Sequence, residues 1–331
     1  MDMIDSFRGW SPIRVFWAGA GSCQVDWCRM GNVRFTDPFF TGTIDRRMRE
    51  QFNLVFRRHS SIEVLGALVR SGRECVAPTG FIFHISRCGS TLVSQMLATL
   101  SQNIVISEPL PIDSVVRSAQ HESSVTNAEV ITRLRDLVHC LAEPRQGEQH
   151  LFIKFDSWTT LQMDVVLAAF PDVPWVFVYR DPLEVLVSHV RNPGSQMIPG
   201  TRGHVLSDVP FDAAVAMPAE EYGAKVIAEF CAAALRHADD ENGLFINYDR
   251  LPDAVTAEIC GHFGVMFSDE ETAKMQAAAR RDAKTPMVDF TADSETKRSW
   301  ASDAVRLAAD QVRPLYDRLE AVSTRSTEAA K

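Results

Sequence analysis

The sequence predicts an α/β fold in which helices cover both faces of a parallel β-sheet. From about residue 80 onward, short apolar runs of the kind that form strands alternate with helical patterns. This alternation is typical of parallel sheets, whose strands are joined by helical crossovers. The chain has 331 residues, of which 46% are hydrophobic, so it can bury one or two cores. The first apolar run also ends in a loop of small residues that opens a helix, which predicts a P-loop-like anion site.

Five strands and the helices between them follow from this pattern. Thr126 and Glu129 have the spacing of a capping box, and Pro171 ends the helix before it. The strands are expected at 81–85, 103–106, 151–155, 176–179 and 244–247. The helices are expected at 90–100, 126–142, 159–170, 182–190 and 219–238, with three more at the C-terminal end.

Residues 1–75 do not share this alternation, and we expect them to form a small N-terminal β/α extension to a domain of residues 76–331. Their turn residues and apolar runs predict short antiparallel strands followed by two helices. The strands are expected at 14–18, 23–30 and 33–35, and the helices at 44–56 and 61–70.

Composition excludes several classes of partner. The net charge of −9, without a basic domain, argues against a nucleic-acid partner. No apolar run approaches the ~18 residues of a membrane span, and the N-terminus lacks the pattern of a signal peptide, so we expect no membrane partner. The seven cysteines show neither C-x-x-C nor zinc spacing, which indicates reduced thiols in a cytoplasmic protein and no metal site. The oligomeric state is left open.

The loop Ser86-Arg87-Cys88-Gly89-Ser90-Thr91 is the most informative segment. It joins the apolar run 81–85 to the helix that starts near residue 90, so the N–H groups and positive dipole of that helix point at the loop. Gly89 permits close approach of an anion, the two hydroxyls add donors, and Arg87 adds a forked cation. No Lys follows Gly89, so this is not a Walker A loop.

A second segment has the same form. The apolar run 174–179 ends in Arg180, Asp181 and Pro182, where Asp181 can cap a helix that has Pro182 at its first position. Ser188 follows about two turns along that helix.

Together these segments resemble the P-loop sulfotransferases that use 3′-phosphoadenosine 5′-phosphosulfate (PAPS), of a bacterial type with an additional N-terminal segment. In that family a loop of the form basic-[SC]-G-[TS]-T binds the 5′-phosphosulfate, and an Arg followed eight residues later by a Ser binds the 3′-phosphate. A late strand followed by Tyr-Glu-Asp-Leu is similar to residues 244–252, where Tyr248 would approach the adenine and Asp249 stands where Glu is commoner. The resemblance therefore implies a donor site of Ser86, Arg87, Cys88, Gly89, Ser90, Thr91, Arg180, Ser188 and Tyr248.

Cys88 stands where the family commonly has Ser. We expect it to fill the loop as a small residue. The alternative is a thiol whose pKa is lowered by the electropositive loop.

The resemblance also implies the catalytic groups of an in-line sulfonate transfer without a metal. Arg87 would contact the leaving phosphate, and Lys154 would either reach the sulfonate or cap the end of its strand. Glu108, 21 residues after Arg87, has the spacing of the base in tyrosylprotein sulfotransferases. The alternative is a structural pairing of Glu108 with Arg87. The candidate bases held in reserve are His189 and His204, whereas His84 is expected to be a core residue.

The expected reaction moves a sulfonate from PAPS to a hydroxyl or amine of a small-molecule, carbohydrate or peptide acceptor. The long irregular stretch 192–218 and the N-terminal extension are expected to border the acceptor, because loops around a rigid scaffold usually carry specificity. Two alternatives remain: a kinase-like P-loop phosphotransferase and a non-catalytic nucleotide-binding relative. The missing Walker Lys counts against the first.

Overall fold

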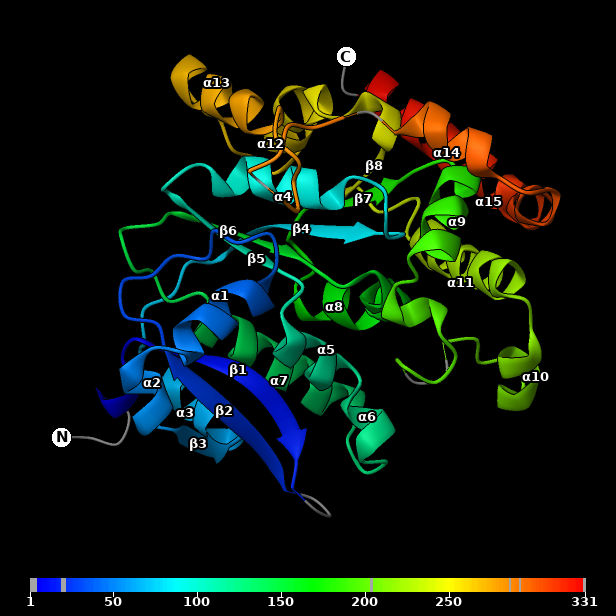
Figure 1. The fold of residues 1–331 in the computed structure, drawn as a ribbon. Helices are drawn as coiled ribbons and strands as arrows, with labels where there is room; N and C mark the ends of the chain where they lie inside the picture. The colour runs from blue at the N-terminus through cyan, green and yellow to red at the C-terminus, as the bar shows by residue number, and fades with distance from the viewer. Residues whose placement is uncertain (1–4, 19–21, 203–204, 286, 292, 330–331) are drawn as a thin grey trace.

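Five parallel strands form the central sheet of this protein, in the order β5-β6-β4-β7-β8 (Figure 1). They are β4 (Pro78–His84), β5 (Asn103–Ser107), β6 (His150–Lys154), β7 (Trp175–Tyr179) and β8 (Gly243–Asn247). The computed structural model describes residues 5–18, 22–202, 205–285, 287–291 and 293–329. All five strands expected from the apolar runs are present, and the predicted α/β fold is confirmed.

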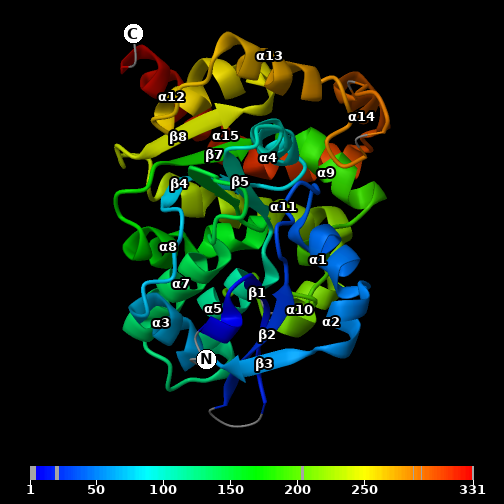
Figure 2. The ribbon, with the colours of Figure 1, turned by 90° about the vertical axis from the view of Figure 1, so that its left-hand side faces the viewer.

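Helices cover both faces of this sheet (Figures 1 and 2). On one face lie α4 (Ser90–Ala98), α12 (Cys260–His262) and α13 (Asp269–Ala278); on the other lie α7 (Asn127–Leu141) and α8 (Met163–Ala169). The remaining helices of this part are α5 (Leu110–Val116), α6 (Ser118–His121), α9 (Pro182–Arg191), α10 (Phe211–Ala216), α11 (Ala219–Leu235), α14 (Ser294–Trp300) and α15 (Asp303–Ala329). No helix within the described ranges is both long and apolar enough to cross a bilayer.

Local sequence signals set the starts of two of these helices. The Thr126 hydroxyl accepts from the Glu129 N–H while the Glu129 carboxylate accepts from the Thr126 N–H, so the predicted capping box opens α7. The Asp181 carboxylate caps α9 by accepting from the Leu183 N–H, with Pro182 at the first helical position. The predicted helix 159–170 differs, because Ser157–Gln162 is a 3₁₀ helix and only α8 is α-helical.

The N-terminal part forms a separate antiparallel sheet, with one strand in an unexpected place. Its strands are β1 (Trp10–Trp17), β2 (Cys23–Arg29) and β3 (Arg58–Ser61). The expected strand at 33–35 is wrong: β3 takes its place, a four-residue edge strand whose polar sequence carries no alternation to reveal it. The expected helix 44–56 is two helices, α1 (Phe40–Met48) and α2 (Gln51–Val55), while α3 (Glu63–Arg70) matches the second expected helix.

The apolar core continues from one sheet to the other. Helices α5 and α7 lie between the small sheet and the parallel sheet (Figures 1 and 2). Trp27 of β2 and Leu65 of α3 belong to the same buried cluster as Phe81 and Phe177 of the parallel sheet. Burying these apolar surfaces together is the main term that holds the N-terminal part in place.

The chain changes direction in the sheet at β4, and this creates the crevice of the fold. After β4 the chain builds β5 and β6 on one side, and then crosses to build β7 and β8 on the other. In such sheets the crevice lies at the carboxyl ends of the strands, where the order reverses. Residues 85–89 follow β4 directly and therefore stand at this point.

Candidate functional site

The carboxyl ends of the strands bring the predicted site residues to one edge of the sheet. Residues 85–89 follow β4, Glu108 follows β5, Lys154 ends β6, Arg180 follows β7 and Tyr248 follows β8. The five strands thus act as a rigid scaffold for side chains that are far apart in sequence.

Backbone strain is concentrated at this edge. Among the described residues other than glycine, only Ser86, Arg87 and Glu108 have positive φ, at 74°, 54° and 56°. This conformation costs roughly 1–2 kcal/mol for an L-residue. The turn at Ser86 is held by its N–H, which donates to His84 Nδ1 at 3.0 Å. Strain that the surrounding structure maintains in this way is typical of ligand sites.

Gly89 is required at the start of α4 for two reasons. Its φ of +85° is the left-handed conformation that glycine tolerates. A Cβ atom there would lie 2.7 Å from Leu251 Cδ1 and 2.9 Å from Tyr248 Cδ2. The missing side chain therefore lets the segment after β8 pack directly on the loop.

Two cavities meet at this loop. The Glu108 cavity, of about 380 Å³, also contains Asp156 and Trp158. The Arg180 cavity, of about 260 Å³, also contains Ser188 and Tyr248. The residues that line both cavities are Arg87, Ser90, Thr91 and Lys284. A molecule in one cavity and a molecule in the other would therefore contact the same side chains.

Arg180 is buried in a network of acceptors. Its Nε donates to Glu184 Oε2 at 2.7 Å, and its Nη2 donates to Asp293 Oδ1 at 2.9 Å and to Ser294 Oγ at 3.0 Å. The guanidinium also lies 3.8 Å from the centroid of the Tyr248 ring, a cation–π distance. Glu184 is itself buried and accepts from Arg298.

The Arg180 cavity carries more positive than negative charge. Lys297 Nζ lies 2.8 Å from Asp293 Oδ2, so the Asp293 carboxylate bridges Lys297 and Arg180. Arg281 and Lys284 also line the cavity. Withdrawal from solvent, together with the cations Arg87 and Lys154, lowers the pKa of Lys284, although much of its side chain stays accessible. An anion in this cavity would relieve the repulsion among these cations.

Glu108 is held by Lys154 and not by Arg87. Lys154 is completely buried and forms an ion pair with Glu108 Oε1. The pair forms because β5 and β6 are neighbours with Ser107 opposite Lys154, and the Glu108 N–H donates to the Lys154 carbonyl at 2.6 Å. The expected alternative, a structural pairing of Glu108 with Arg87, is wrong. Lys154 lies behind Glu108 and does not line either cavity.

The histidines near the site are neutral. His84 accepts from the Ser86 N–H through Nδ1 and lies 3.0 Å from the Phe155 carbonyl through Nε2, which fixes a neutral tautomer. Burial and Lys154 hold its pKa well below 6.5. Burial, then the charge of Arg87, lowers the pKa of His189 to about 3. The third histidine, His204, lies outside the described residues.

Asp156 is a carboxylic acid that the sequence argument missed. It is buried in the wall of the Glu108 cavity. Desolvation, followed by the negative charges of Glu108 and Asp113, raises its pKa well above 3.8. A carboxyl group in this environment is an acid that retains its proton beyond the usual range of Asp.

Cys88 fills space in the loop and is not activated. Its thiol is fully buried and donates to the Val178 carbonyl at 3.0 Å. Burial raises its pKa to about 11, so the idea that the electropositive loop lowers this pKa is wrong. The expectation of a loop-filling residue fits this geometry.

Both segments that the sequence argument placed beside the acceptor contribute to the Glu108 cavity. Phe39 and Thr41 come from the N-terminal part, and Gly194, Ser195 and Arg202 come from the stretch 192–218. That stretch is less irregular than expected, because it contains the 3₁₀ turn Ser195–Met197 and α10. It is joined to the loop by the Arg87 Nη2, which donates to the Asn192 carbonyl at 2.9 Å.

The largest gap in the sequence argument is the segment before α14. Lys284 and Asp293 line the cavities from this segment, and Lys297 lines the Arg180 cavity from α14 itself. The segment has no strand or amphipathic period that would place it. The only available signal was its local charge pattern, with Arg280, Arg281 and Lys284 close together. In the described part of the chain, no three His, Cys, Asp or Glu side chains come together as metal ligands would.

Several solved structures are similar in fold. The sulfotransferase domain from the curacin biosynthetic pathway is 15% identical with a TM-score of 0.38, covering 72% of this chain and 99% of that chain. A sulfotransferase from Mycobacterium avium is 10% identical with a TM-score of 0.44, covering 71% and 79%. The sulfotransferase domain of the Synechococcus PCC 7002 olefin synthase is 17% identical with a TM-score of 0.41, covering 74% and 96%. These values concern the arrangement of the chain and not its chemistry. No protein-family model and no curated protein sequence matches the chain.

Proposed function

We propose that this protein is a sulfotransferase that moves a sulfonate from PAPS to a hydroxyl or amine. The observation that carries the proposal is the meeting of two cavities at one loop, with Arg87, Ser90, Thr91 and Lys284 in the walls of both. A group transfer between two bound molecules needs such a junction, because donor and acceptor must be held in line on either side of the moving group.

The donor would occupy the Arg180 cavity. Its 5′-phosphosulfate would lie over Gly89 and the first turn of α4, where the helix dipole favours an anion. Its 3′-phosphate would reach Arg180, Ser188 and Lys297, and its adenine would lie near Tyr248. Asp293 holds the two cations that the 3′-phosphate needs, so donor binding would displace this carboxylate.

Charge stabilisation at the junction would carry most of the rate. Arg87 and Lys284 are the cations that line both cavities, so they can neutralise the sulfonate oxygens and the leaving phosphate. The hydroxyls of Ser90 and Thr91 add donors at the same point. In the reaction the acceptor oxygen or nitrogen forms a bond to sulfur, the bond between sulfur and the phosphate oxygen breaks, and adenosine 3′,5′-bisphosphate leaves.

Glu108 is the best candidate to receive the acceptor's proton. Within the described residues its contacts with Lys154 and His84 use Oε1, which leaves Oε2 for the acceptor. Asp156 lies in the same cavity but keeps its own proton more readily, because its pKa is raised. His84 and His189 are both poor bases in this environment, since burial disfavours their charged forms. Lys154 would act by holding Glu108 in place.

The acceptor would enter the Glu108 cavity between the N-terminal part and the stretch 192–218. Aromatic Phe39 and Trp158 line this space, and Arg202 lies over the Trp158 ring at 4.5 Å. These side chains favour an acceptor with an apolar body. All seven cysteines are unpaired, which suits the reducing cytoplasm as the place of reaction.

Ligand-induced stabilisation tests the donor class directly. The thermal midpoint is measured with adenosine 3′,5′-bisphosphate in the absence of metal, and separately with ATP and magnesium. A ligand that binds only the folded protein raises this midpoint. We expect the bisphosphate to raise it, and the Ser188→Ala protein to need more bisphosphate for the same rise. Stabilisation by ATP and magnesium alone would instead indicate a phosphotransferase, and no response to either would reject the donor site.

A further inference from the structure

A large basic and aromatic cavity lies in the N-terminal part, away from the candidate site. Its volume is about 830 Å³, within the range of small-molecule sites. It shares no lining residue with the Glu108 and Arg180 cavities. Its wall includes the Glu143–Arg145 segment, which precedes β6 and therefore belongs to the amino ends of the strands. The candidate site stands at their carboxyl ends, so the two are distinct.

Arginines dominate the charge of this N-terminal cavity. Glu143 is its only acidic residue, and that carboxylate already pairs with Arg73 at 2.8 Å and accepts from the Gly9 N–H. No arginine of the wall forms an ion pair within the described part of the chain. These arginines are Arg8, Arg29, Arg57, Arg58 and Arg145. In a protein with a net charge of −9, such a group of cations without ion-pair partners favours an anionic occupant.

Arg145 adds a largely buried positive charge to the wall, and its guanidinium lies 4.9 Å from the centroid of the Phe35 ring. Its Nη1 donates to the Glu143 carbonyl at 3.2 Å, but its Nε and Nη2 are buried without an acceptor among the described residues. Buried donors are nearly always satisfied in folded proteins, by protein, water or ligand. Burial lowers the pKa of Arg145 to about 10, so the side chain still carries its charge at neutral pH.

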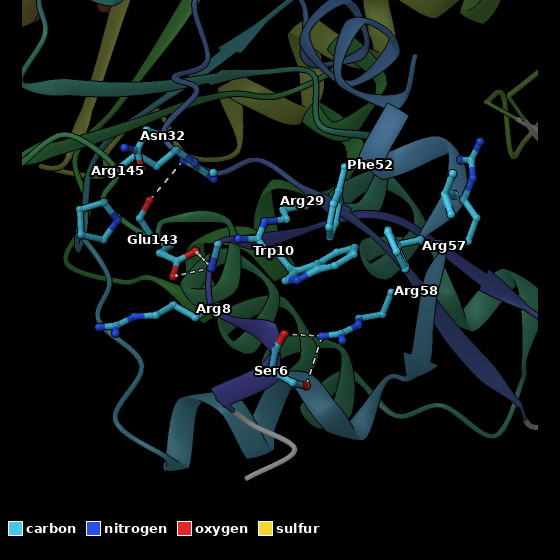
Figure 3. Close-up of a pocket in the computed structure, with 15 residues that line it drawn as sticks. Ser6, Arg8, Trp10, Arg29, Asn32, Phe52, Arg57, Arg58, Glu143 and Arg145 are labelled. Carbon is cyan, nitrogen blue, oxygen red and sulfur yellow. Dashed lines mark hydrogen bonds between the residues drawn. The ribbon is translucent and has the colours of Figure 1, made fainter. Parts of the chain in front are cut away.

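Aromatic rings line the same space. In Figure 3 the Trp10 ring lies in the middle of the cavity residues, with the arginines distributed around it. Phe52 is 5.9 Å from Trp10 between ring centroids, and the Arg29 guanidinium lies 5.0 Å from the Phe52 ring. Phe56 and Val55 are 57% and 72% exposed at the cavity wall, although both are large and apolar. A ligand that covers them would remove apolar surface from water.

We propose that this cavity is a second ligand site, which binds a free small organic anion that joins a phosphate or sulfate group to a flat aromatic body. The anion would pair with Arg29 and Arg57 at the cavity wall, and the aromatic body would lie against the neighbouring Phe52 and Phe56 rings, whose centroids are 4.8 Å apart. Because the cavity shares no lining residue with the Glu108 and Arg180 cavities, its occupant is neither the donor nor the acceptor of the proposed transfer.

Calorimetry with three matched probes tests the chemistry. The probes are 1-naphthyl phosphate, its neutral counterpart 1-naphthol, and inorganic phosphate, all titrated with saturating adenosine 3′,5′-bisphosphate present to fill the donor site. We expect 1-naphthyl phosphate to bind at least tenfold more tightly than either part alone, because the cavity supplies both kinds of contact. Equal affinity for naphthol and naphthyl phosphate would overturn the anionic assignment.

Two variants locate the binding. Arg29→Ala combined with Arg57→Ala removes two exposed cations of the cavity, and we expect it to weaken 1-naphthyl phosphate by roughly tenfold or more for each arginine. Arg49→Ala removes another exposed arginine that does not line the cavity, and it should leave the affinity unchanged. Circular dichroism confirms that each variant is folded. Unchanged binding in the double variant would reject this cavity as the site.

A membrane surface is the competing occupant, because exposed aromatic and basic residues also bind anionic lipids. Vesicles of phosphatidylcholine with 30% phosphatidylserine are sedimented with the wild-type and the Arg29→Ala/Arg57→Ala proteins. We expect no retention of either protein. Retention that depends on these two arginines, without binding of 1-naphthyl phosphate, would replace the small anion with a lipid surface.

Discussion

The carboxylate of Asp293 lies 2.9 Å from Arg180 Nη2 and 2.8 Å from Lys297 Nζ, between the two cations that the proposed 3′-phosphate needs. Asp293 is half exposed, so it can leave this position without a large loss of buried contacts. The carboxylate therefore competes with the donor, and the affinity for the donor product should depend on it.

Asp293→Asn is expected to strengthen the binding of adenosine 3′,5′-bisphosphate. The substitution keeps the shape of the side chain but removes the competing charge, which we expect to raise affinity by about threefold to tenfold after allowance for solvent screening. Isothermal titration calorimetry measures the change. Asp310→Asn removes the same charge from an exposed position on α15 and should have no effect. Weaker binding in Asp293→Asn would mean that Asp293 orders the cations for the ligand.

Gly89→Ala is expected to destabilise the protein and to abolish bisphosphate binding. Alanine at a φ of +85° costs roughly 1–2 kcal/mol, and its Cβ would press against Leu251 and Tyr248. Urea unfolding measures the free energy of unfolding, and a thermal shift measures binding. Gly261→Ala is the matched control, because nothing lies within 4 Å of its added Cβ and the residue is helical. A Gly89→Ala protein with wild-type stability and binding would contradict the geometry of the loop.

Glu108→Gln is expected to lower turnover by about 10²- to 10⁴-fold with little change in bisphosphate affinity, as for loss of a general base. It should also reduce the free energy of unfolding by on the order of 3 kcal/mol, because it leaves the buried Lys154 without its counter-charge.

A second substitution separates these two effects. In Glu108→Gln/Lys154→Met neither charge remains, so we expect stability to recover towards the wild-type value while turnover stays low. Recovery of turnover along with stability would show that Glu108 acts through Lys154 and not as the base.

His189 is expected to make the protein less stable in acid. Its pKa is about 3 in the folded protein, against 6.5 when unfolded, so the unfolded chain binds one more proton between these values. The free energy of unfolding therefore falls as pH drops below 6.5, by up to about 1.4 kcal/mol per pH unit from this residue. His189→Gln should flatten the stability profile between pH 6.5 and 4. An unchanged profile would mean that His189 is solvated in the folded state.

The stretch 192–218 is expected to become more ordered when ligands bind. Arg87 holds the first residue of the stretch through the Asn192 carbonyl, and Arg202 of the same stretch lines the Glu108 cavity. An anion bound at the loop would therefore attract both arginines and change the contacts of the stretch. Hydrogen exchange of its described residues should slow when bisphosphate is added. Exchange that is already slow in the free protein, and stays the same with ligand, would remove the role of a lid.

The main fold could be predicted because its signals are local. Each strand of the parallel sheet is a short apolar run with clear ends. Such a buried strand can be recognised from its own residues, without knowing which strand it pairs with. The capping box of α7 and the Asp181–Pro182 start of α9 are likewise formed by residues that are close in the sequence. Because parallel strands share one functional edge, the positions of Glu108 and Arg180 after their strands also brought them to the crevice.

The parts that could not be predicted depend on which elements become neighbours. Lys154 pairs with Glu108 because β6 lies between β5 and β4, an order that differs from the order in sequence. Asp293 reaches Arg180 across 113 residues. The strand β3 has polar residues and exists only because β2 offers it an edge. No local pattern encodes such contacts.

The left-handed conformations of Ser86, Arg87 and Glu108 lower the stability of the fold, while their side chains belong to the proposed reaction. Glycine at Ser86 or Arg87 would relax the backbone, and a selection for heat resistance alone would favour it. At Glu108 the same change would leave the buried Lys154 without its counter-charge, which costs more than the strain. Each such change would also delete a side chain of the proposed reaction. The chain therefore keeps strained backbone where the proposed reaction needs side chains, and an evolutionary drift toward stability at Ser86 and Arg87 would be visible as loss of the proposed activity.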